Sequence, residues 1–414
     1  MTQNVIVSPS SALDKAGSAI IAAMPIAALG NIFTLFHLGG LSFHATDLLF
    51  CFGFLLAAIT LLLERGTQIS PRWYVVAILI MVETSATGIV LLGNVVDWAK
   101  YFRFLETLLW GILALLFVRT ERQSQKFLNS IIIAATVLSS TSIYLFLTNP
   151  ELQRIAGYFS YAGGEGLDVQ ASYNELGAFY SVALACMMWR IFTNGWTFLR
   201  VLLLAVVGFG LLLTQSRSSF LATATVLTIF GFFWIKKVSR EGLNFRSLAT
   251  AFSVLILLIC AFFASSLLSI NRISESFVSG SNAATSMSVR YELWHKSLEL
   301  WTAGPSRFLL GYGSAKFDAL LQSSTADCFY LDHGLSQGLL GLFLILSILV
   351  TPSLKLWHQR SEKQGALLAT SVLVVALIVS ITGNVLVDPM FGGVTFALSY
   401  GVLAAYHRTE VAEF

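Results

Sequence analysis

The sequence predicts an all-α membrane protein whose chain crosses a lipid bilayer about twelve times. Of its 414 residues, 56% are hydrophobic and 11% are charged, whereas soluble domains carry about 25% charged residues. Apolar runs of roughly 20 residues, the length that a helix needs to span the hydrocarbon core, recur along the chain. Because backbone polar groups must be satisfied internally in lipid, we expect each run to form a helix.

The apolar runs follow one another from near the N-terminus to near the C-terminus. They comprise residues 16–36, 47–63, 73–93, 104–118, 127–148, 175–192, 198–216, 218–235, 248–270, 334–354, 366–386 and 390–406. An even number of crossings places both termini on one side of the membrane. We therefore expect a single transmembrane domain over residues 1–414, with two long loops on the opposite side, at 149–174 and 271–333.

The distribution of positive charge predicts the orientation. Of the 25 Lys and Arg residues, 16 lie in segments assigned to the side of the termini. Cytoplasmic loops carry the excess of Lys and Arg in membrane proteins. Apart from the loop over 271–333, the opposite side keeps only Lys100, Arg103, Arg154 and Arg217. We therefore expect cytoplasmic termini, with both long loops outside the cytoplasm.

The loop over 271–333 carries cations on the side where Lys and Arg are normally rare. They are Arg272, Arg290, Lys296, Arg307 and Lys316. Within the loop, residues 286–300 place apolar and aromatic side chains at helical spacing, which predicts an amphipathic helix on the membrane surface or packed over the bundle. Arginines in this position, beside acidic residues, indicate that the protein binds an anion outside the cytoplasm.

Arg217 is the most informative single residue. It lies between two apolar runs, in LLLTQSRSSFLATATV, and a cation at mid-span costs on the order of 2.5–3.5 kcal/mol. Gln215 and the neighbouring hydroxyl residues supply polar partners. The pattern predicts a buried anion site with Arg217 as a catalytic residue and Gln215 as a substrate-binding residue. The alternative is an arginine that caps a tight turn and reaches the lipid headgroups.

Arg290 is expected to open the loop helix, where the helix dipole favours anions. Together with Arg217 on the same side, it would form a clamp, because guanidinium groups present a rigid fork of donors to phosphate oxygens. Each charged hydrogen bond is worth about 1.5–3 kcal/mol. We predict Arg290 as a second catalytic arginine; the alternative is a solvated loop residue.

A polar group precedes the span that begins GLSQGLLGLF. Asp327 is a candidate catalytic base, or a group that orients a sugar hydroxyl, and Tyr330 is a candidate sugar contact. Asp332 is interpreted as the N-cap of the span. His333 is a candidate substrate-binding residue, with a structural role as its alternative. Asn174, at the start of an earlier span, either caps that helix or faces the outer cavity and binds substrate.

Two acidic residues, Glu83 and Glu106, fall inside predicted spans, whereas Asp47 and Glu175 only open theirs. Intramembrane carboxylates are often functional; the alternative is that these two reach the headgroups or pair with Arg103. The sequence contains no DxD motif, metal-ligand cluster, P-loop or Rossmann signature. We therefore expect neither a metal nor a cofactor, and the energy must come from an activated substrate. The net charge of +3 gives no indication of a nucleic-acid partner.

Four segments resemble the superfamily of O-antigen ligases and Wzy-type O-antigen polymerases. SYNELGAFYSVALA is similar to the Asn-containing start of a span, and TQSRSSFLA to the arginine that follows a span. SVRYELWHKSLELWTAGPSRFLLGYGSAKF resembles the extracytoplasmic stretch, in which Arg and Trp precede Pro and Gly-x-Gly. DCFYLDHGLSQGLLGLFLIL resembles the element that leads into the next span. The resemblance covers roughly residues 170–350.

One departure from the family pattern favours a polymerase. Ligases typically carry His-Asn where this chain has Asp327-Cys328, counted back from Gly338. An acidic residue at this position resembles the pattern of polymerases more than that of ligases. His333 lies six residues away and is not equivalent to the ligase histidine.

The resemblance implies a fold like that of class C glycosyltransferases and a mechanism. A glycan on undecaprenyl pyrophosphate would be transferred to a hydroxyl of a second lipid-linked repeat unit, on the periplasmic face of the bacterial inner membrane. Arg217 and Arg290 would stabilise the leaving pyrophosphate, and Asp327 would act as the base. The implied partners are the lipid-linked oligosaccharide, membrane lipids and a candidate chain-length regulator protein.

Other functions stay open at this point. Within the enzyme class, the main alternative is a ligase that transfers polymer to lipid A–core. A transporter is the rival from another class, because twelve spans are typical of the major facilitator fold. That fold has a long cytoplasmic connection at its middle, whereas the longest excursion here lies outside, between spans nine and ten.

Overall fold

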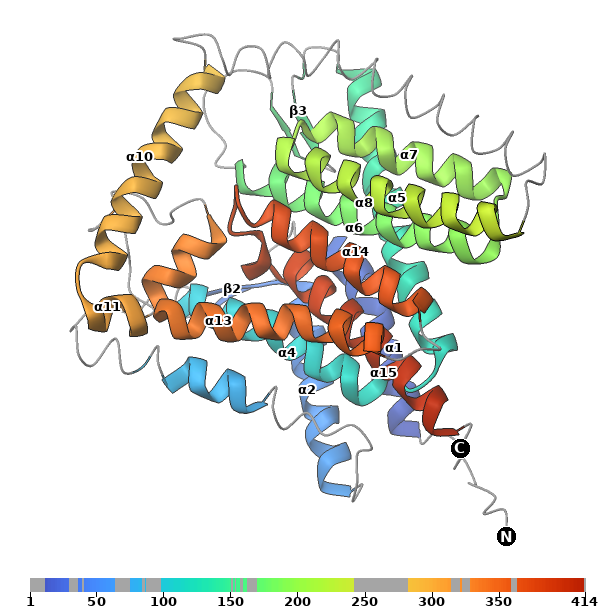
Figure 1. Ribbon diagram of the computed structural model, residues 1–414, viewed down its shortest axis with the longest axis horizontal. Coiled ribbons are helices and arrows are strands. Elements are labelled where there is room, and N and C mark those ends of the chain that lie inside the picture. Colours follow the sequence, from blue (N-terminus) through green and yellow to red (C-terminus); the bar gives the residue numbers. More distant parts are fainter. Residues whose placement is uncertain are drawn as a thin grey trace.

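In the computed structural model, the part of the chain that the structure describes is mostly helical (Figure 1). It comprises residues 12–29, 36–38, 41–63, 75–83, 86, 98–149, 152, 154–156, 159–161, 170–241, 282–313, 321, 328–358 and 363–412. Two short antiparallel hairpins accompany the helices, and the apolar periodicity did not predict either of them. They are formed by β1 (Phe36–Leu38) with β2 (Leu41–Phe43), and by β3 (Arg154–Ala156) with β4 (Phe159–Tyr161).

Most of the helices overlap a predicted apolar run, and two of them lie in the predicted loop over 271–333. They are α1 (Ala12–Ala27), α2 (Ala45–Leu63), α4 (Trp98–Phe117), α5 (Glu121–Thr148), α6 (Gln170–Asn194), α7 (Phe198–Thr214), α8 (Arg217–Glu241), α10 (Asn282–Thr302), α11 (Pro305–Leu310), α13 (Phe329–His358), α14 (Lys363–Val379) and α15 (Val394–Ala412). A 3₁₀ turn, η2 (Val385–Val387), and a π-helical turn, η3 (Pro389–Gly393), join α14 to α15.

Several helices can cross a membrane. Among the described residues, α5, α6, α8 and α13 are long and apolar enough to cross a membrane. α2, α7, α14 and α15 contain shorter apolar helical segments. The predicted span over 248–270 lies outside the described residues. The structure therefore bears out a multi-pass helical protein, and the number of crossings stays a prediction.

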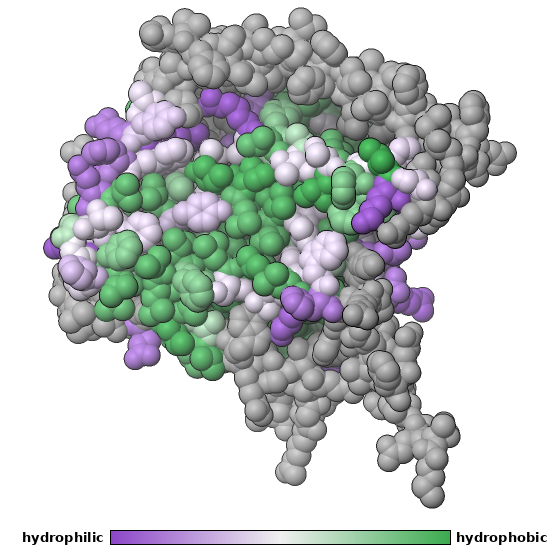
Figure 2. All heavy atoms as spheres, viewed as in Figure 1, coloured by the Kyte–Doolittle hydropathy of each residue, from purple (hydrophilic) through white to green (hydrophobic). Residues whose placement is uncertain are grey.

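The bundle is built around α6. This helix packs against α5, α7, α8 and α14, and α15 packs along α4. Figure 2 shows a broad apolar face with hydrophilic residues gathered at its left-hand and right-hand margins. Large apolar side chains stand outward on the bundle, with 65% of Phe52, 64% of Phe232 and 64% of Phe343 exposed. Apolar surface of this extent is unfavourable in water and suits contact with lipid.

One end of the bundle, which we call the Arg119 end, contains an ion pair between helices and a helix cap. Arg119 follows α4, and its Nη2 lies 2.6 Å from Oδ1 of the buried Asp14 on α1. Thr120 caps α5 through a capping box with Gln123. The opposite end holds the start of α6, the α7–α8 turn, the start of α13 and the end of α14, and we call it the Arg217 end.

α13 is broken by Gly338, which adopts φ 64° and ψ −170° inside the helix. A Cβ on this residue would lie 2.2 Å from the carbonyl oxygen of Leu309, at the end of α11. A Cβ on Gly311 would lie 2.6 Å from the backbone nitrogen of Gly338, and the N–H of Tyr312 donates to the carbonyl of Leu335 at 2.6 Å. The two glycines therefore allow α11 to insert its end into the break in α13.

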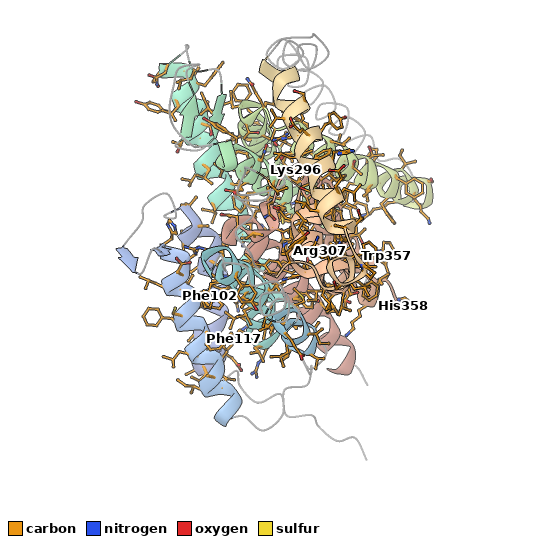
Figure 3. The ribbon with its side chains drawn as sticks, turned by 90° about the vertical axis from the view of Figure 1, so that its left-hand side faces the viewer. Phe102, Phe117, Lys296, Arg307, Trp357 and His358 are labelled. Atoms are coloured by element: carbon orange, nitrogen blue, oxygen red, sulfur yellow. The ribbon has the colours of Figure 1, made fainter. Side chains whose placement is uncertain are left out.

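α10 crosses the left-hand end of the bundle at a steep angle to α13 (Figure 1). Figure 3 looks onto this end and labels Lys296 on α10 and Arg307 on α11. The helix packs on α13 and α11, which is one of the two positions predicted for it. Its contact with α13 depends on Gly334, because a Cβ there would lie 2.8 Å from the Trp301 ring.

Candidate functional site

The turn between α7 and α8 positions Arg217. Gln215 adopts a left-handed conformation with φ 51°, and its N–H donates to the carbonyl of Leu212 at 3.1 Å. The N–H of Ser216 donates to Oγ1 of Thr214 at 3.3 Å. α8 then begins at Arg217, which is half-buried, as is Gln215. A cation at this position lies at the positive end of the helix dipole, so an anion beside it would be favourable.

A ladder of small polar residues fixes this turn against α6. Oγ of Ser216 donates to Oδ1 of Asn174 at 3.2 Å and lies 2.9 Å from Oγ of Ser219. One turn further along, Oγ of Ser181 donates to the carbonyl of Ser219 at 3.1 Å and accepts from Oγ1 of Thr223 at 2.9 Å. Such hydroxyl contacts and small residues are typical of close helix packing in membranes.

One interpretation of the sequence proposed that Asn174 caps α6, but it does not. The helix begins at Gln170, so Asn174 is its fifth residue, and its side chain instead accepts from Ser216. A Cβ on Gly383 would lie 3.9 Å from Nδ2 of Asn174. Asn174 therefore lies between the α7–α8 turn and the segment after α14.

The start of α13 joins the same end of the bundle. The N–H of Phe329 donates to the carbonyl of Ser380 at 3.0 Å, and the hydroxyl of Tyr330 donates to the carbonyl of Leu377 at 2.7 Å. These bonds anchor α13 on α14. Tyr330 is half-buried, and the lone pairs of its hydroxyl oxygen can accept a hydrogen bond.

Asp332 differs from the expectation, and His333 packs against aromatic rings. Asp332 is not an N-cap: α13 begins at Phe329, the N–H of Asp332 donates to the carbonyl of Cys328 at 2.9 Å, and the residue is buried. The His333 ring lies between the rings of Phe104 and Phe329, with centroid distances of 4.3 Å and 4.2 Å. This packing between α4 and α13 fits the structural alternative for His333.

Arg290 does not open the loop helix. α10 begins at Asn282, so Arg290 is the ninth residue, and the helix N-terminus lies two turns away. The argument from the helix dipole was therefore wrong for Arg290, because the dipole acts within the first turn. Arg290 is half-buried on the helix that crosses the Arg217 end. Asp327, the candidate base, lies outside the described residues.

Most of these residues lie in the part of the chain that is similar to a known protein family. Residues 201–346 match the family model described as O-Antigen ligase. The match supports the superfamily of O-antigen ligases and polymerases and does not separate the two activities. The curated proteins contain no match to this chain.

The segment matched to the O-antigen ligase family runs from α7 into α13. It includes Arg217, Arg290, Asp327, Tyr330 and His333. It agrees with most of the region for which the sequence motifs predicted the resemblance. Asn174 lies before the matched segment and joins it through its bond to Ser216.

A charged group outside the matched segment was missed by the sequence analysis. Arg103 on α4 pairs with Asp47 on α2, and its Nη1 lies 3.2 Å from Oε2 of Glu106. Pairing with Arg103 was one of the explanations considered for Glu106, and the structure shows this pair. Asp388, between η2 and η3, interacts electrostatically with Arg103 and with Glu175 on α6. The attractive contacts of Arg103 therefore connect α2, α4 and the break between α14 and α15, whereas the carboxylates of Asp388 and Glu175 repel each other.

The Arg217 end thus combines a cation with amide, hydroxyl and carboxylate groups. Guanidinium and amide donors can hold an anion, and carboxylates can accept a proton or orient a hydroxyl. Within the described ranges, no three His, Cys, Asp or Glu side chains converge as metal ligands would. The chemistry that these residues offer is anion stabilisation and proton transfer.

Proposed function

We propose that the chain is a membrane glycosyltransferase that polymerises a surface polysaccharide such as O-antigen. It would transfer a glycan from undecaprenyl pyrophosphate to a hydroxyl of a lipid-linked repeat unit, on the periplasmic face of the bacterial inner membrane. The superfamily match and the apolar helices support this proposal. The positive-charge distribution supports the orientation, with both termini in the cytoplasm.

The observation that carries the proposal is the position of Arg217. Arg217 is half-buried and is the first residue of α8, in the segment that matches the O-antigen ligase family. At this position the helix dipole favours an anion. The polar ladder from Asn174 to Thr223 holds this turn in one place. Preorganised donors stabilise charge that develops in a transition state without reorganisation at the moment of reaction.

The chemistry follows from the two substrates. The acceptor hydroxyl attacks the anomeric carbon of the donor glycan, a new glycosidic bond forms, and the bond to the pyrophosphate oxygen breaks. Negative charge accumulates on the leaving pyrophosphate, and Arg217 and Arg290 would stabilise it more in the transition state than in the ground state. The proton of the acceptor hydroxyl would pass to Asp327, while Gln215 and Tyr330 would contact substrate.

A second candidate function is ligation of polymer to lipid A–core, which the description of the matched family favours. Asp327, at the position where ligases typically carry His, favours the polymerase. Both reactions use the same donor and the same leaving group. They differ in the acceptor, so the acceptor is what an experiment must identify.

Deletion of the gene and gel analysis of the lipopolysaccharide separate these functions. Loss of a polymerase should leave core with a single repeat unit, whereas loss of a ligase should leave bare core with accumulated lipid-linked polymer. An unchanged surface glycan would contradict both. Complementation with Arg217→Ala should fail to restore the polymer, while Arg122→Ala should restore it. Arg122 is a matched control because it is exposed near the start of α5, at the Arg119 end.

A further inference from the structure

The inner face of α10 carries a stripe of polar and aromatic residues, of which the proposed reaction uses only Arg290. Arg290, Trp294, Ser297 and Trp301 follow one another at intervals of four, three and four residues, which places them on one face of the helix. Glu292, His295 and Glu299 lie on the opposite face and are exposed. The stripe therefore faces the protein and begins at Arg290.

Trp301 fixes the direction of this face. Its ring packs where Gly334 of α13 leaves room, and its Nε1 donates to the carbonyl of Phe308 at 3.0 Å. It belongs to a small hydrophobic cluster with Tyr312 and Leu335. The end of α10 is thereby held on α13, and the residues one and two turns earlier extend the same inward face toward Arg290.

Two polar groups on this face have no hydrogen-bond partner among the described residues. They are Oγ of Ser297, whose residue is 0% exposed, and Nε1 of Trp294, which is also buried. A buried helical hydroxyl commonly donates to the carbonyl four residues earlier, as Thr302 in the same helix does to Leu298 at 2.8 Å. Ser297 makes no such bond. Buried polar groups are usually paired in folded proteins. Other described helices also hold buried groups without a partner, such as Ser353. The pair on α10 is singled out because it continues the face that begins at Arg290.

We propose that Trp294 and Ser297 form a saccharide-binding strip beside Arg290, which contacts the sugar units of the lipid-linked substrate. An indole N–H can only donate, a hydroxyl can donate and accept, and a guanidinium group only donates. A ligand of this strip must therefore be rich in oxygen acceptors. The strip adds no charge beyond Arg290, so a neutral polyhydroxyl group fits it better than a second phosphate.

The aromatic ring supports the same ligand class. Aromatic walls with a few placed polar groups are typical of small-molecule sites, and the face of an indole ring packs well against the C–H face of a sugar. The inference rests on the proposed function, since it takes the saccharide to be the one attached to undecaprenyl pyrophosphate. It adds a contact that distinguishes a glycan-bearing lipid from the bare lipid.

Binding measurements on the full chain in lipid nanodiscs, by native mass spectrometry, test the strip. The two probes are undecaprenyl pyrophosphate and the undecaprenyl pyrophosphate-linked repeat unit extracted from the host. Ser297→Ala and Trp294→Phe should each weaken binding of the repeat unit about three- to tenfold, as expected for one lost hydrogen bond. Binding of the bare lipid should be unchanged, because neither group contacts pyrophosphate. Trp294→Phe keeps an aromatic ring and so preserves the packing.

Ser353→Ala is the matched control. Ser353 is a buried serine in the second half of α13 whose hydroxyl also has no hydrogen-bond partner among the described residues, and its loss should leave both affinities unchanged. Wild-type affinity for the repeat unit in both strip variants would overturn the inference, because water would then satisfy the two groups. Equal weakening for both probes would also overturn it. A wild-type chain that binds neither probe would contradict the proposed function itself.

Discussion

The close approach of α6 and α8 gives the sharpest test of how Arg217 is held. A Cβ on Gly177 of α6 would lie 2.7 Å from Oγ of Ser219 and 2.9 Å from Cβ of Ser216. The Ser219 hydroxyl can rotate away, but the Ser216 Cβ is fixed to the backbone that precedes Arg217. Gly177→Ala must therefore push the start of α8 outward by several tenths of an ångström.

The change in stability expected for Gly177→Ala has two opposing contributions. Alanine is a better helix former than glycine by about 1 kcal/mol, whereas overpacking of a tight contact costs about 1–3 kcal/mol. The net loss of stability should therefore be small, about 0–2 kcal/mol by difference. The effect on transfer should be larger, because a misplacement of about 1 Å can cost about 100-fold in rate. We expect Gly177→Ala to lose about 10- to 100-fold of its transfer activity.

The assay compares thermal unfolding of the purified protein with polymer formation in a deletion strain. Gly231→Ala is the matched control, because Gly231 also lies in a helix, α8 itself, and nothing lies within 4 Å of its added Cβ. It should unfold at the same or a higher temperature and keep full activity. Wild-type polymer from Gly177→Ala, or an equal loss from Gly231→Ala, would refute the reasoning.

Three further changes have defined outcomes. Gly338→Ala should abolish recovery of folded protein, measured by gel filtration, because the residue has φ 64° and its Cβ would meet the Leu309 carbonyl at 2.2 Å; normal yield would contradict the interlocked break. Arg103→Ala should lower the free energy of unfolding by roughly 3–5 kcal/mol, since it leaves the buried Asp47 and Glu106 carboxylates without their cation; an unchanged denaturation midpoint would oppose this. Asp14→Ala, at the Arg119 end, should lower the unfolding temperature but retain polymer formation in the protein that inserts, and a folded yet inactive variant would contradict the assignment of the site to the Arg217 end.

The sequence predicted the elements of the fold better than their ends. Apolar run length located the helices that are long and apolar enough to cross a membrane, because hydrocarbon thickness imposes the same requirement on each. It could not locate the start of α10, since residues 282–288 (NAATSMS) carry little apolar periodicity and helix formation there depends on neighbouring structure. The role expected for Arg290 at a helix N-terminus failed for this reason.

The candidate site could be predicted from the sequence only in part. Arg217 stood out as a candidate because a cation between two apolar runs has a local cost that needs an explanation. The group of Asp47, Arg103 and Asp388 was not, because three separate segments bring it together. The break at Gly338 was also hidden, since a glycine within an apolar run does not reveal its φ value.

Transfer by the purified protein tests the central claim most directly. The full chain in proteoliposomes is supplied with the undecaprenyl pyrophosphate-linked repeat unit, and mass spectrometry follows the formation of lipid-linked products with two or more repeats. We predict a ladder of products with the wild type and none with Arg217→Ala at equal protein content. A ladder of equal intensity with Arg217→Ala, or no extended product from the wild type, would contradict the account.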